Sequence, residues 1–342
     1  MSDTCILTFL GDIYLPKAYR SSIDLENYVV NLEYPITSHT IGVSGKINLK
    51  SSKNFLKETF KRNPLAVCLA NNHILDYGDA GFDQTISVLA EDSIHSFGCG
   101  HITDNYNNPL YLELSGVSLA LLGYACQSTS PPPDINLVGI STINKRRIFE
   151  DIASAKSHGA NRIIVNLHWG AEEISVPKPS DVNLARSIID AGADLIIGHH
   201  AHCIQSHEKY KGKYIFYGLG NCVFPDLNVA CNFNTNTQLP EGQYIKKQKS
   251  WNKISLMVNY DVITESVQIN KMCFDGRQLK YKRNILTSTS KVKLNVRNLS
   301  NIEFRYKLMY KLCILRLMLI NYLSNPRMIK VKDIRLIFQN IS

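Results

Sequence analysis

Five short apolar runs in the first two thirds of the chain each end in a cluster of polar residues. The clusters are Gly11-Asp12, Glu33, Asn71-Asn72-His73, His168-Trp169-Gly170 and Gly198–His202. Apolar runs of this length, rich in Val, Ile and Leu, are typical of buried β-strands. Because ligand sites in open α/β sheets form beyond the carboxyl ends of the strands, we expect these clusters to converge on one site.

The donor types in the clusters favour a transition-metal site. Carboxylate, amide oxygen and imidazole together suit Mn, Fe or Zn better than Mg or Ca, which prefer oxygen alone. A carboxylate that bridges two cations, with imidazoles in the outer positions, is the usual layout of two-metal hydrolytic sites. The three histidines between residues 199 and 202 are the strongest signal. Taken singly, Glu33 is explained equally well as the cap of a following helix. Taken singly, His168 is explained as a histidine buried in the core.

The rest of the sequence alternates between further apolar runs and helical patterns. Helices are predicted at 51–62, 81–92, 144–158 and 180–191, and further strands at 118–123, 214–217, 253–260 and 266–274. This alternation predicts a layered α/β fold, although periodicity leaves open whether it holds one sheet or two. Segments 127–140 and 226–250 have the composition of loops, and a loop as long as the second is often a lid or a binding loop.

Cysteine usage and the N-terminus bear on the compartment. The nine cysteines are an odd count without a CxxC pair, so neither a disulfide framework nor a zinc ribbon is expected, and a reducing compartment is the simpler interpretation. The apolar run Ile6–Leu10 is too short for a signal sequence or a membrane anchor. We therefore expect a cytoplasmic protein, peripheral at the inner face of the membrane if its C-terminal part touches lipid.

Positive charge is concentrated at the C-terminal end. Residues 276–342 hold 15 Lys or Arg against two acidic residues, a net charge of +13 in a chain of +9 overall. Residues 302–323 have a helical pattern with one apolar stripe, formed by Phe304, Leu308, Leu312, Leu315 and Leu319. We expect this stripe to pack on the domain; an anionic membrane surface and a phosphate backbone are the alternative partners. The predicted domains are 1–285, a metal-binding unit, and 286–342, a basic and largely helical tail.

The polar clusters belong to longer motifs. These run from Asn31 to Thr37, from Leu69 to Gly78, from Asn166 to Glu172, from Ala191 to His202 and from Tyr217 to Asn221. Together, over about residues 5–225, they resemble the CapA family of capsule-synthesis proteins, which are linked to poly-γ-glutamate and other surface polymers. The resemblance implies the calcineurin-like metallophosphoesterase fold, a four-layer α/β sandwich of two mixed β-sheets flanked by helices. The basic helical C-terminal appendage lies outside it.

The resemblance also implies a ligand set. Asp12 would hold the first of one or two divalent metals (Mn, Fe or Zn), and Glu33 would take the bridging place. The second metal would be held by Asn72 and His168. His200 and His202 match the family's His-x-His motif, which supplies one imidazole to each metal, and the role of His199 stays open.

Two further residues are expected to act on the substrate. His73 would stand outside the metal shell as a proton donor or as an oxyanion stabiliser for a leaving group. Glu172 would orient His168 or a substrate amine. One departure weighs against a tightly bound metal pair, because Tyr14 stands where the general metallophosphoesterase pattern has a histidine ligand.

Three functions follow from these expectations. The leading one is a metal-dependent hydrolase of the phosphoesterase type, acting on a phosphorylated or polymeric surface-glycan or polyglutamate substrate in capsule or surface-polymer biosynthesis. The alternative is a non-catalytic metal-binding scaffold or polymer-binding partner in a biosynthetic complex, which Tyr14 favours. A nucleic-acid phosphodiesterase comes last, because residues 1–275 are net acidic and the tail lacks an aromatic-basic recognition motif. Nucleic acid is therefore not an expected partner.

Overall fold

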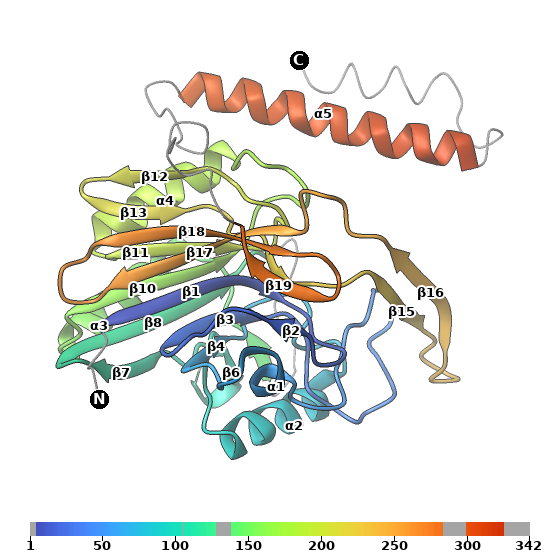
Figure 1. Ribbon diagram of the computed structural model, residues 1–342, viewed down its shortest axis with the longest axis horizontal. Helices are drawn as coiled ribbons and strands as arrows, with labels where there is room; N and C mark the ends of the chain where they lie inside the picture. Colours follow the sequence, from blue (N-terminus) through green and yellow to red (C-terminus); the bar gives the residue numbers. More distant parts are fainter. Residues whose placement is uncertain (1–4, 105, 128–137, 283–298, 325–342) are drawn as a thin grey trace.

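The computed structural model describes residues 5–104, 106–127, 138–282 and 299–324, and two large mixed β-sheets dominate it (Figure 1). The order of the nine-stranded sheet is β2 (Arg20–Ser21), β19 (Gln278–Tyr281), β18 (Val267–Phe274), β17 (Ile254–Asp261), β1 (Ile6–Ile13), β3 (Tyr28–Leu32), β4 (Ala66–Cys68) and β5 (His95–Phe97), with β14 (Asn221–Val223) beside β1. The six-stranded sheet runs β12 (His207–Tyr210), β13 (Lys213–Phe216), β11 (Leu195–His199), β10 (Arg162–His168), β8 (Val117–Ala125) and β7 (Leu110–Leu114).

Parallel strands form one side of the nine-stranded sheet and the centre of the six-stranded sheet, and they carry the predicted apolar runs. β1, β3, β4 and β5 are parallel neighbours, as are β8, β10, β11 and β13. The predicted runs at the N-terminus and at 28–32, 66–70, 118–123, 162–167, 194–197 and 214–217 are confirmed as strands. Because parallel strands end at the same edge, this arrangement brings distant strand ends together.

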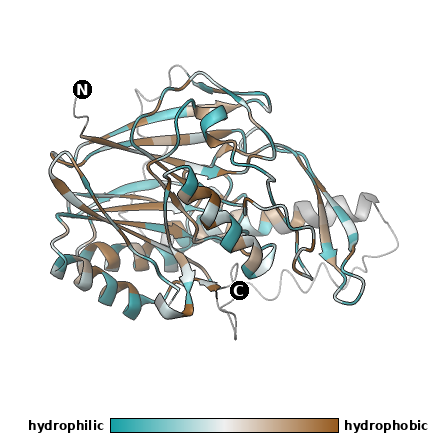
Figure 2. Cartoon of the chain, turned by 90° about the horizontal axis from the view of Figure 1, so that it is seen from below, coloured by the Kyte–Doolittle hydropathy of each residue, from teal (hydrophilic) through white to brown (hydrophobic). Residues whose placement is uncertain are grey.

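Side-chain alternation along β8 shows how the layers pack. Leu119 and Leu121 belong to a core that also holds residues of the nine-stranded sheet. The intervening Ala120 and Leu122 belong to a second core with residues of α3 (Lys145–Ser157) and α4 (Pro179–Ala191). Burial on both faces explains why these strands read as continuous apolar runs. Figure 2 shows mostly brown strands inside and helices of mixed brown and teal outside.

Two helices, α1 (Leu56–Phe60) and α2 (Gly78–Glu91), accompany the nine-stranded sheet and contact its strands β2 and β5. The predicted helix at 51–62 is shorter than expected. Ser51 pairs instead with the backbone around Ile36, and a left-handed conformation at Lys61 (φ 70°) ends the helix after Phe60. α4 ends at Gly192 (φ 116°), the position that the sequence indicates for its C-cap.

The loop prediction for 226–250 is wrong. This segment forms an antiparallel hairpin of β15 (Leu227–Phe233) and β16 (Pro240–Lys246), which projects at one side of the molecule (Figure 1). Most side chains of β16 are exposed, so the strand lacks the apolar alternation by which a strand is read from sequence. In the other predicted loop, residues 128–137 lie outside the described part, and Val138–Ile140 forms β9, which pairs with β6 (Cys99–His101).

The C-terminal helix is confirmed, but its predicted packing face is wrong. α5 (Leu299–Ser324) lies outside both sheets, and it contacts α4 (Figure 1). Ile302 is buried, whereas Phe304, Leu308 and Leu312 of the predicted stripe are 64%, 45% and 56% exposed. The 285/286 domain boundary falls in 283–298, outside the described residues. Among the described helices, none combines the length and apolar character needed to cross a bilayer.

Candidate metal centre

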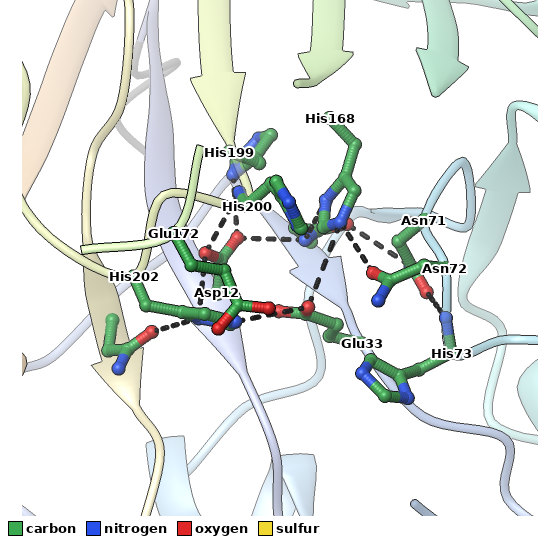
Figure 3. Close-up of polar contacts among 12 residues, drawn as sticks. Asp12, Glu33, Asn71, Asn72, His73, His168, Glu172, His199, His200 and His202 are labelled. Carbon is green, nitrogen blue, oxygen red and sulfur yellow. Dashed lines mark hydrogen bonds and ion pairs between the residues drawn. The ribbon is translucent and has the colours of Figure 1, made fainter. Parts of the chain in front are cut away.

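The six residues predicted as ligands lie together at the ends of five strands (Figure 3). Asp12 belongs to β1, Glu33 follows β3, and Asn72 follows β4. His168 ends β10, while His200 and His202 follow β11. Five of the six are buried, with exposed fractions between 0% and 7%; these are Asp12, Glu33, His168, His200 and His202.

Glu33 stands at the centre of this cluster, shared by two groups of three. In one, donor atoms of Glu33, His168 and His200 lie within 4.8 Å of one another; in the other, those of Asp12, Glu33 and His202 do. Nε2 of His168 and Nε2 of His202 each lie 3.7 Å from the same oxygen, Oε1 of Glu33. A carboxylate between two sets of ligands is the arrangement that a bridging role requires.

The unsatisfied atoms of the site fit a cation. Within the described part of the chain, neither carboxylate oxygen of Glu33 has a hydrogen-bond partner, nor does Nδ1 of His200. Burial, reinforced by Asp12, raises the pKa of Glu33 well above its ordinary value. A buried carboxylate without partners costs several kcal/mol. Oxygen and imidazole donors of this kind suit Mn, Fe or Zn.

Burial keeps the imidazoles of His168 and His200 neutral, which is the form that binds a metal. It lowers the pKa of His168 well below the ordinary value, and His200 adds to the effect. It also lowers the pKa of His200 to about 4, with a contribution from His202. Nε2 of His168 lies 2.7 Å from Oδ1 of Asn72, which brings the amide to the same side as Glu33.

Asn31 was not singled out by the sequence, although it holds two of the predicted ligands. Its Nδ2 donates to Oδ1 of Asp12 at 2.8 Å and lies 3.3 Å from Nδ1 of His168. The backbone N–H of His200 donates to the other oxygen of Asp12 at 3.2 Å. Asn31 and Glu33 are two residues apart around the end of β3, and this spacing places their side chains on one face of the strand. The spacing could therefore have identified Asn31 as a residue of the site.

His199, whose role the sequence left open, lies beside Asp12 and belongs to neither of the two groups around Glu33. Its Nδ1 is 3.2 Å from Oδ1 of Asp12. Burial alone would raise the pKa of Asp12, but His199, His202 and Asn31 together hold it below its ordinary value. Asp12 is therefore an ionised ligand candidate, whereas burial disfavours the charged form of Glu33 as long as no cation lies beside it.

The chain turns sharply after β11, and this turn aims two histidines at the site. His200 and His202 have left-handed backbone conformations, with φ values of 81° and 52°. Such values are uncommon for residues other than glycine and persist only where the surrounding structure holds them. Nδ1 of His202 lies 2.8 Å from Oδ1 of Asn221, which leaves its Nε2 toward Glu33.

His73 lies at the edge of the cluster and is oriented by a partner that the sequence did not assign. Its Nδ1 is 2.7 Å from Oδ2 of Asp76, a fully buried residue. Lys46 forms an ion pair with the other oxygen of Asp76 and donates to the main-chain oxygen of Asn72. Asp76 follows His73 by three residues, which is a usable signal, whereas no local pattern in the sequence marks Lys46.

Glu172 lies with His200 and His202, where one donor atom of each forms a third group within 4.8 Å. Its Oε2 accepts from Nζ of Lys246, at the end of β16, at 3.3 Å. Burial alone would raise the pKa of Glu172, but His202, Lys246 and His200 lower it to about 2. The expected role of Glu172 in orienting His168 stays a prediction.

Tyr14 is buried beneath the site and packs among other aromatic rings. Its ring centroid lies 5.5 Å from that of Tyr34 and 5.6 Å from that of Phe224. Burial raises the pKa of Tyr14, so the phenol stays neutral and is a poor metal ligand. Phe224 also contacts the ring of His202, with centroids 5.0 Å apart, which makes the position structural.

A cavity of about 450 Å³ opens beside the cluster. The residues that line it are Gly45, Lys46, Ile47, Asn72, His73, Glu172, Cys231, Asn232 and Tyr244. They come from three separate segments: the loop between β3 and α1, the strand ends and the β15–β16 hairpin. A substrate in this cavity would reach the candidate proton donor and the candidate ligands from one side.

Comparison with known proteins identifies the family. The bacterial capsule synthesis protein family PGA_cap matches residues 16–226, more than half of the chain. The chain belongs to this family. It is 32% identical to the capsule biosynthesis protein CapA of Bacillus anthracis over 248 residues, which cover 64% of this chain and 59% of that protein. It is 33% identical to the PGA biosynthesis protein CapA of Bacillus subtilis (strain 168) over 216 residues, 62% of this chain and 56% of that protein.

The chain thus spans less than two thirds of the length of these curated relatives. Among solved structures, the 5'-nucleotidase precursor from Thermus thermophilus aligns with a TM-score of 0.41 and 12% identity, covering 79% of this chain and 54% of that one. At this level of similarity, neither the reaction nor the substrate of the nucleotidase transfers to this chain.

Proposed function

We propose that this chain is a metal-dependent hydrolase of the phosphoesterase type that acts in capsule or poly-γ-glutamate synthesis. Glu33 carries the proposal: its carboxylate is fully buried, has no hydrogen-bond partner within the described part of the chain, and is shared by two groups of potential ligands. A carboxylate buried without hydrogen-bond partners is stable in the fold once a cation neutralises its charge. The proposal includes the four-layer sandwich of calcineurin-like metallophosphoesterases as the arrangement of the two sheets and their helices.

The residues present fit two divalent cations. Asp12 and His202 would hold one, Asn72, His168 and His200 the other, with Glu33 between them. Bound Mn, Fe or Zn lowers the pKa of a bound water and stabilises charge on a phosphoryl oxygen.

The remaining residues of the site handle the substrate. Asp76 holds Nδ1 of His73 and leaves Nε2 for the substrate, so His73 donates a proton to the leaving group. Lys46 fixes Asp76, and Lys246 fixes Glu172 at the mouth of the cavity. The names of the relatives, which mention capsule and PGA biosynthesis, support a phosphorylated or polymeric glycan or polyglutamate as substrate.

Elemental analysis of the purified chain tests the metal site. We expect Mn, Fe or Zn to copurify with the wild type and to be lost from His200→Ala. His158→Ala, which removes an exposed histidine at the end of α3, is the matched control and should keep the metal. A wild type that binds none of these metals after dialysis against each would refute the proposal.

The non-catalytic scaffold is favoured by one observation, the buried Tyr14 at the position of a missing ligand. His73→Ala separates the two functions. A hydrolase should lose about 10²- to 10⁴-fold of its activity on a panel of phosphoesters and on poly-γ-glutamate while keeping its metal content. A scaffold should keep full polymer production in cells that carry this variant.

A further inference from the structure

α5 has two apolar faces, and only one of them packs on the domain. Ile302, which is 4% exposed, begins a row that continues with Tyr306, Met309 and Cys313 at helical spacing. Oγ of Ser175 donates to Sδ of Met309 at 3.6 Å. This row faces the domain. Met309 and Cys313 line a cavity of about 500 Å³ beneath the helix, and Leu312, at the edge of the row, also borders it.

The second face is largely exposed, with Phe304 and Leu308 outermost and Leu312 at its border with the cavity. Phe304, Leu308 and Leu312 follow one another at intervals of four residues and are 64%, 45% and 56% exposed. At about 100° per residue they form one stripe, on the side of the helix turned away from Ile302 and Tyr306. Single exposed apolar residues need no explanation, but an aligned row of large ones indicates an interaction surface.

Basic side chains border this stripe on both sides. The helical geometry places Arg305 along one edge and Lys307 and Lys311 along the other, and all three belong to a C-terminal segment with a net charge of +13. The sequence of α5 contains a single acidic residue, Glu303, which pairs with Lys307 at 3.2 Å. The exposed face therefore combines apolar and positive character.

We propose that the exposed face of α5 binds the surface of an anionic phospholipid bilayer. The helix would lie in the plane of the interface, with Phe304 and Leu308 among the acyl chains and the basic residues at the phosphates. A nucleic-acid backbone would complement the charges but leave the apolar stripe in water, and a second copy of this chain would bring like charges together. The proposal is independent of the metal site.

Cosedimentation of the full chain with vesicles tests this surface. We expect binding to vesicles of phosphatidylcholine and phosphatidylglycerol in a ratio of about 2:1, and much weaker binding to phosphatidylcholine alone. Phe304→Ser with Leu308→Ser should weaken binding by about tenfold per side chain at any salt concentration. Arg305→Gln with Lys311→Gln should weaken it by about fivefold per charge at low salt, a difference that high salt removes.

Leu239→Ser is the matched control, because Leu239 is 65% exposed at the tip of the β15–β16 hairpin; unchanged binding of this variant supports the proposal. Wild-type affinity of the Phe304/Leu308 variant for the anionic vesicles would overturn it. So would a drop in the unfolding temperature of that variant, which would mean that the stripe packs against the chain itself. A wild-type dimer that this variant converts to a monomer would assign the face to a second copy and also overturn the proposal.

Discussion

Glu33 and Asp12 are both fully buried in the candidate metal centre, but they differ in their hydrogen-bond partners. Asp12 accepts hydrogen bonds from Asn31 and from the backbone of His200, and its pKa is held low. Glu33 receives no hydrogen bond from the described residues, and its pKa is raised. The buried Glu33 side chain therefore lowers the free energy of unfolding of the metal-free protein.

Glu33→Gln should remove this cost together with the metal site. We expect the metal-free variant to be more stable than the metal-free wild type by roughly 1–2 kcal/mol, because a neutral amide replaces a buried carboxylate near Asp12. Addition of Mn²⁺ should stabilise the wild type and not the variant. Urea unfolding with and without Mn²⁺ measures both effects. Glu150→Gln, at an exposed position of α3, is the control, and a Glu33→Gln chain still stabilised by Mn²⁺ contradicts the bridging role.

Asp181 gives the chain a pH-dependent stability outside the metal centre. It lies in the first turn of α4, and burial raises its pKa from 3.8 to about 6, since Lys178 and Ser180 offset the effect only in part. The folded chain thus binds this proton more tightly than the unfolded chain. The resulting stability is fully present below about pH 4 and is lost as the pH rises to about 6.

Asp181→Asn should flatten this part of the pH profile. We expect the variant to be more stable than the wild type by about 1–2 kcal/mol at pH 7, with the difference shrinking toward pH 4. Urea midpoints measured between these pH values give the comparison. If the urea midpoints of the two chains changed equally with pH, Asp181 would be solvated and its pKa would be ordinary.

At the scale of elements, the end of β11 packs directly against the backbone that follows β13. A Cβ on Gly198, in β11, would lie 2.0 Å from the main-chain oxygen of Tyr217, just after β13. Any larger side chain must push the two segments apart. The same strand leads into His200 and His202, so the packing of β11 also sets the position of the two imidazoles.

Gly198→Ala should therefore destabilise the fold by roughly 2–3 kcal/mol and weaken metal binding. Gly242→Ala in β16 is the matched control, because its Cβ would meet only the Sγ of Cys231, at 3.1 Å; we expect its effect to be small. Thermal unfolding and metal content of both variants give the test. A Gly198→Ala chain as stable as the control would mean that β11 and the segment after β13 separate easily.

The β15–β16 hairpin and the loop at 42–48 form one wall of the cavity. Ile47 makes a bridge with Cys231, and the N–H of Asn232 donates to the oxygen of Lys46 at 2.9 Å. These contacts bring Lys46 to Asp76, while β16 brings Lys246 to Glu172. Both lysines are neutralised by buried or half-buried carboxylates, so they act as positioning groups for the candidate catalytic residues.

For the whole molecule, the C-terminal helix supplies no strand to either sheet and none of the described residues of the candidate metal centre. Deletion of residues 286–342 should leave a folded chain that is still stabilised by Mn²⁺. We expect it to lose about 2 kcal/mol or more of stability, because Ile302 and its neighbours no longer bury apolar surface. Urea unfolding with and without Mn²⁺ measures both quantities, and a deletion product that fails to fold would show that 286–342 belongs to the domain.

The sequence by itself predicted which side chains gather at the candidate site. Strand runs and polar strand ends are local patterns, and the order of Asp12, Glu33, Asn72, His168, His200 and His202 along them placed these residues together at one sheet edge. The same period identified the helix of α5, because helical spacing is also local. A partner three residues away, such as Asp76 for His73, can also be predicted from the local sequence.

Only the tertiary structure decided features that depend on contacts between distant segments. It selected the row from Ile302 to Cys313 as the packing face of α5, because both rows have helical spacing and only the shape of the domain distinguishes them. It paired β15 with the polar strand β16, and it brought Lys46 and Lys246 to their carboxylates. Backbone pairing and long-range ion pairs leave no periodic trace in the sequence, so folding alone reveals them.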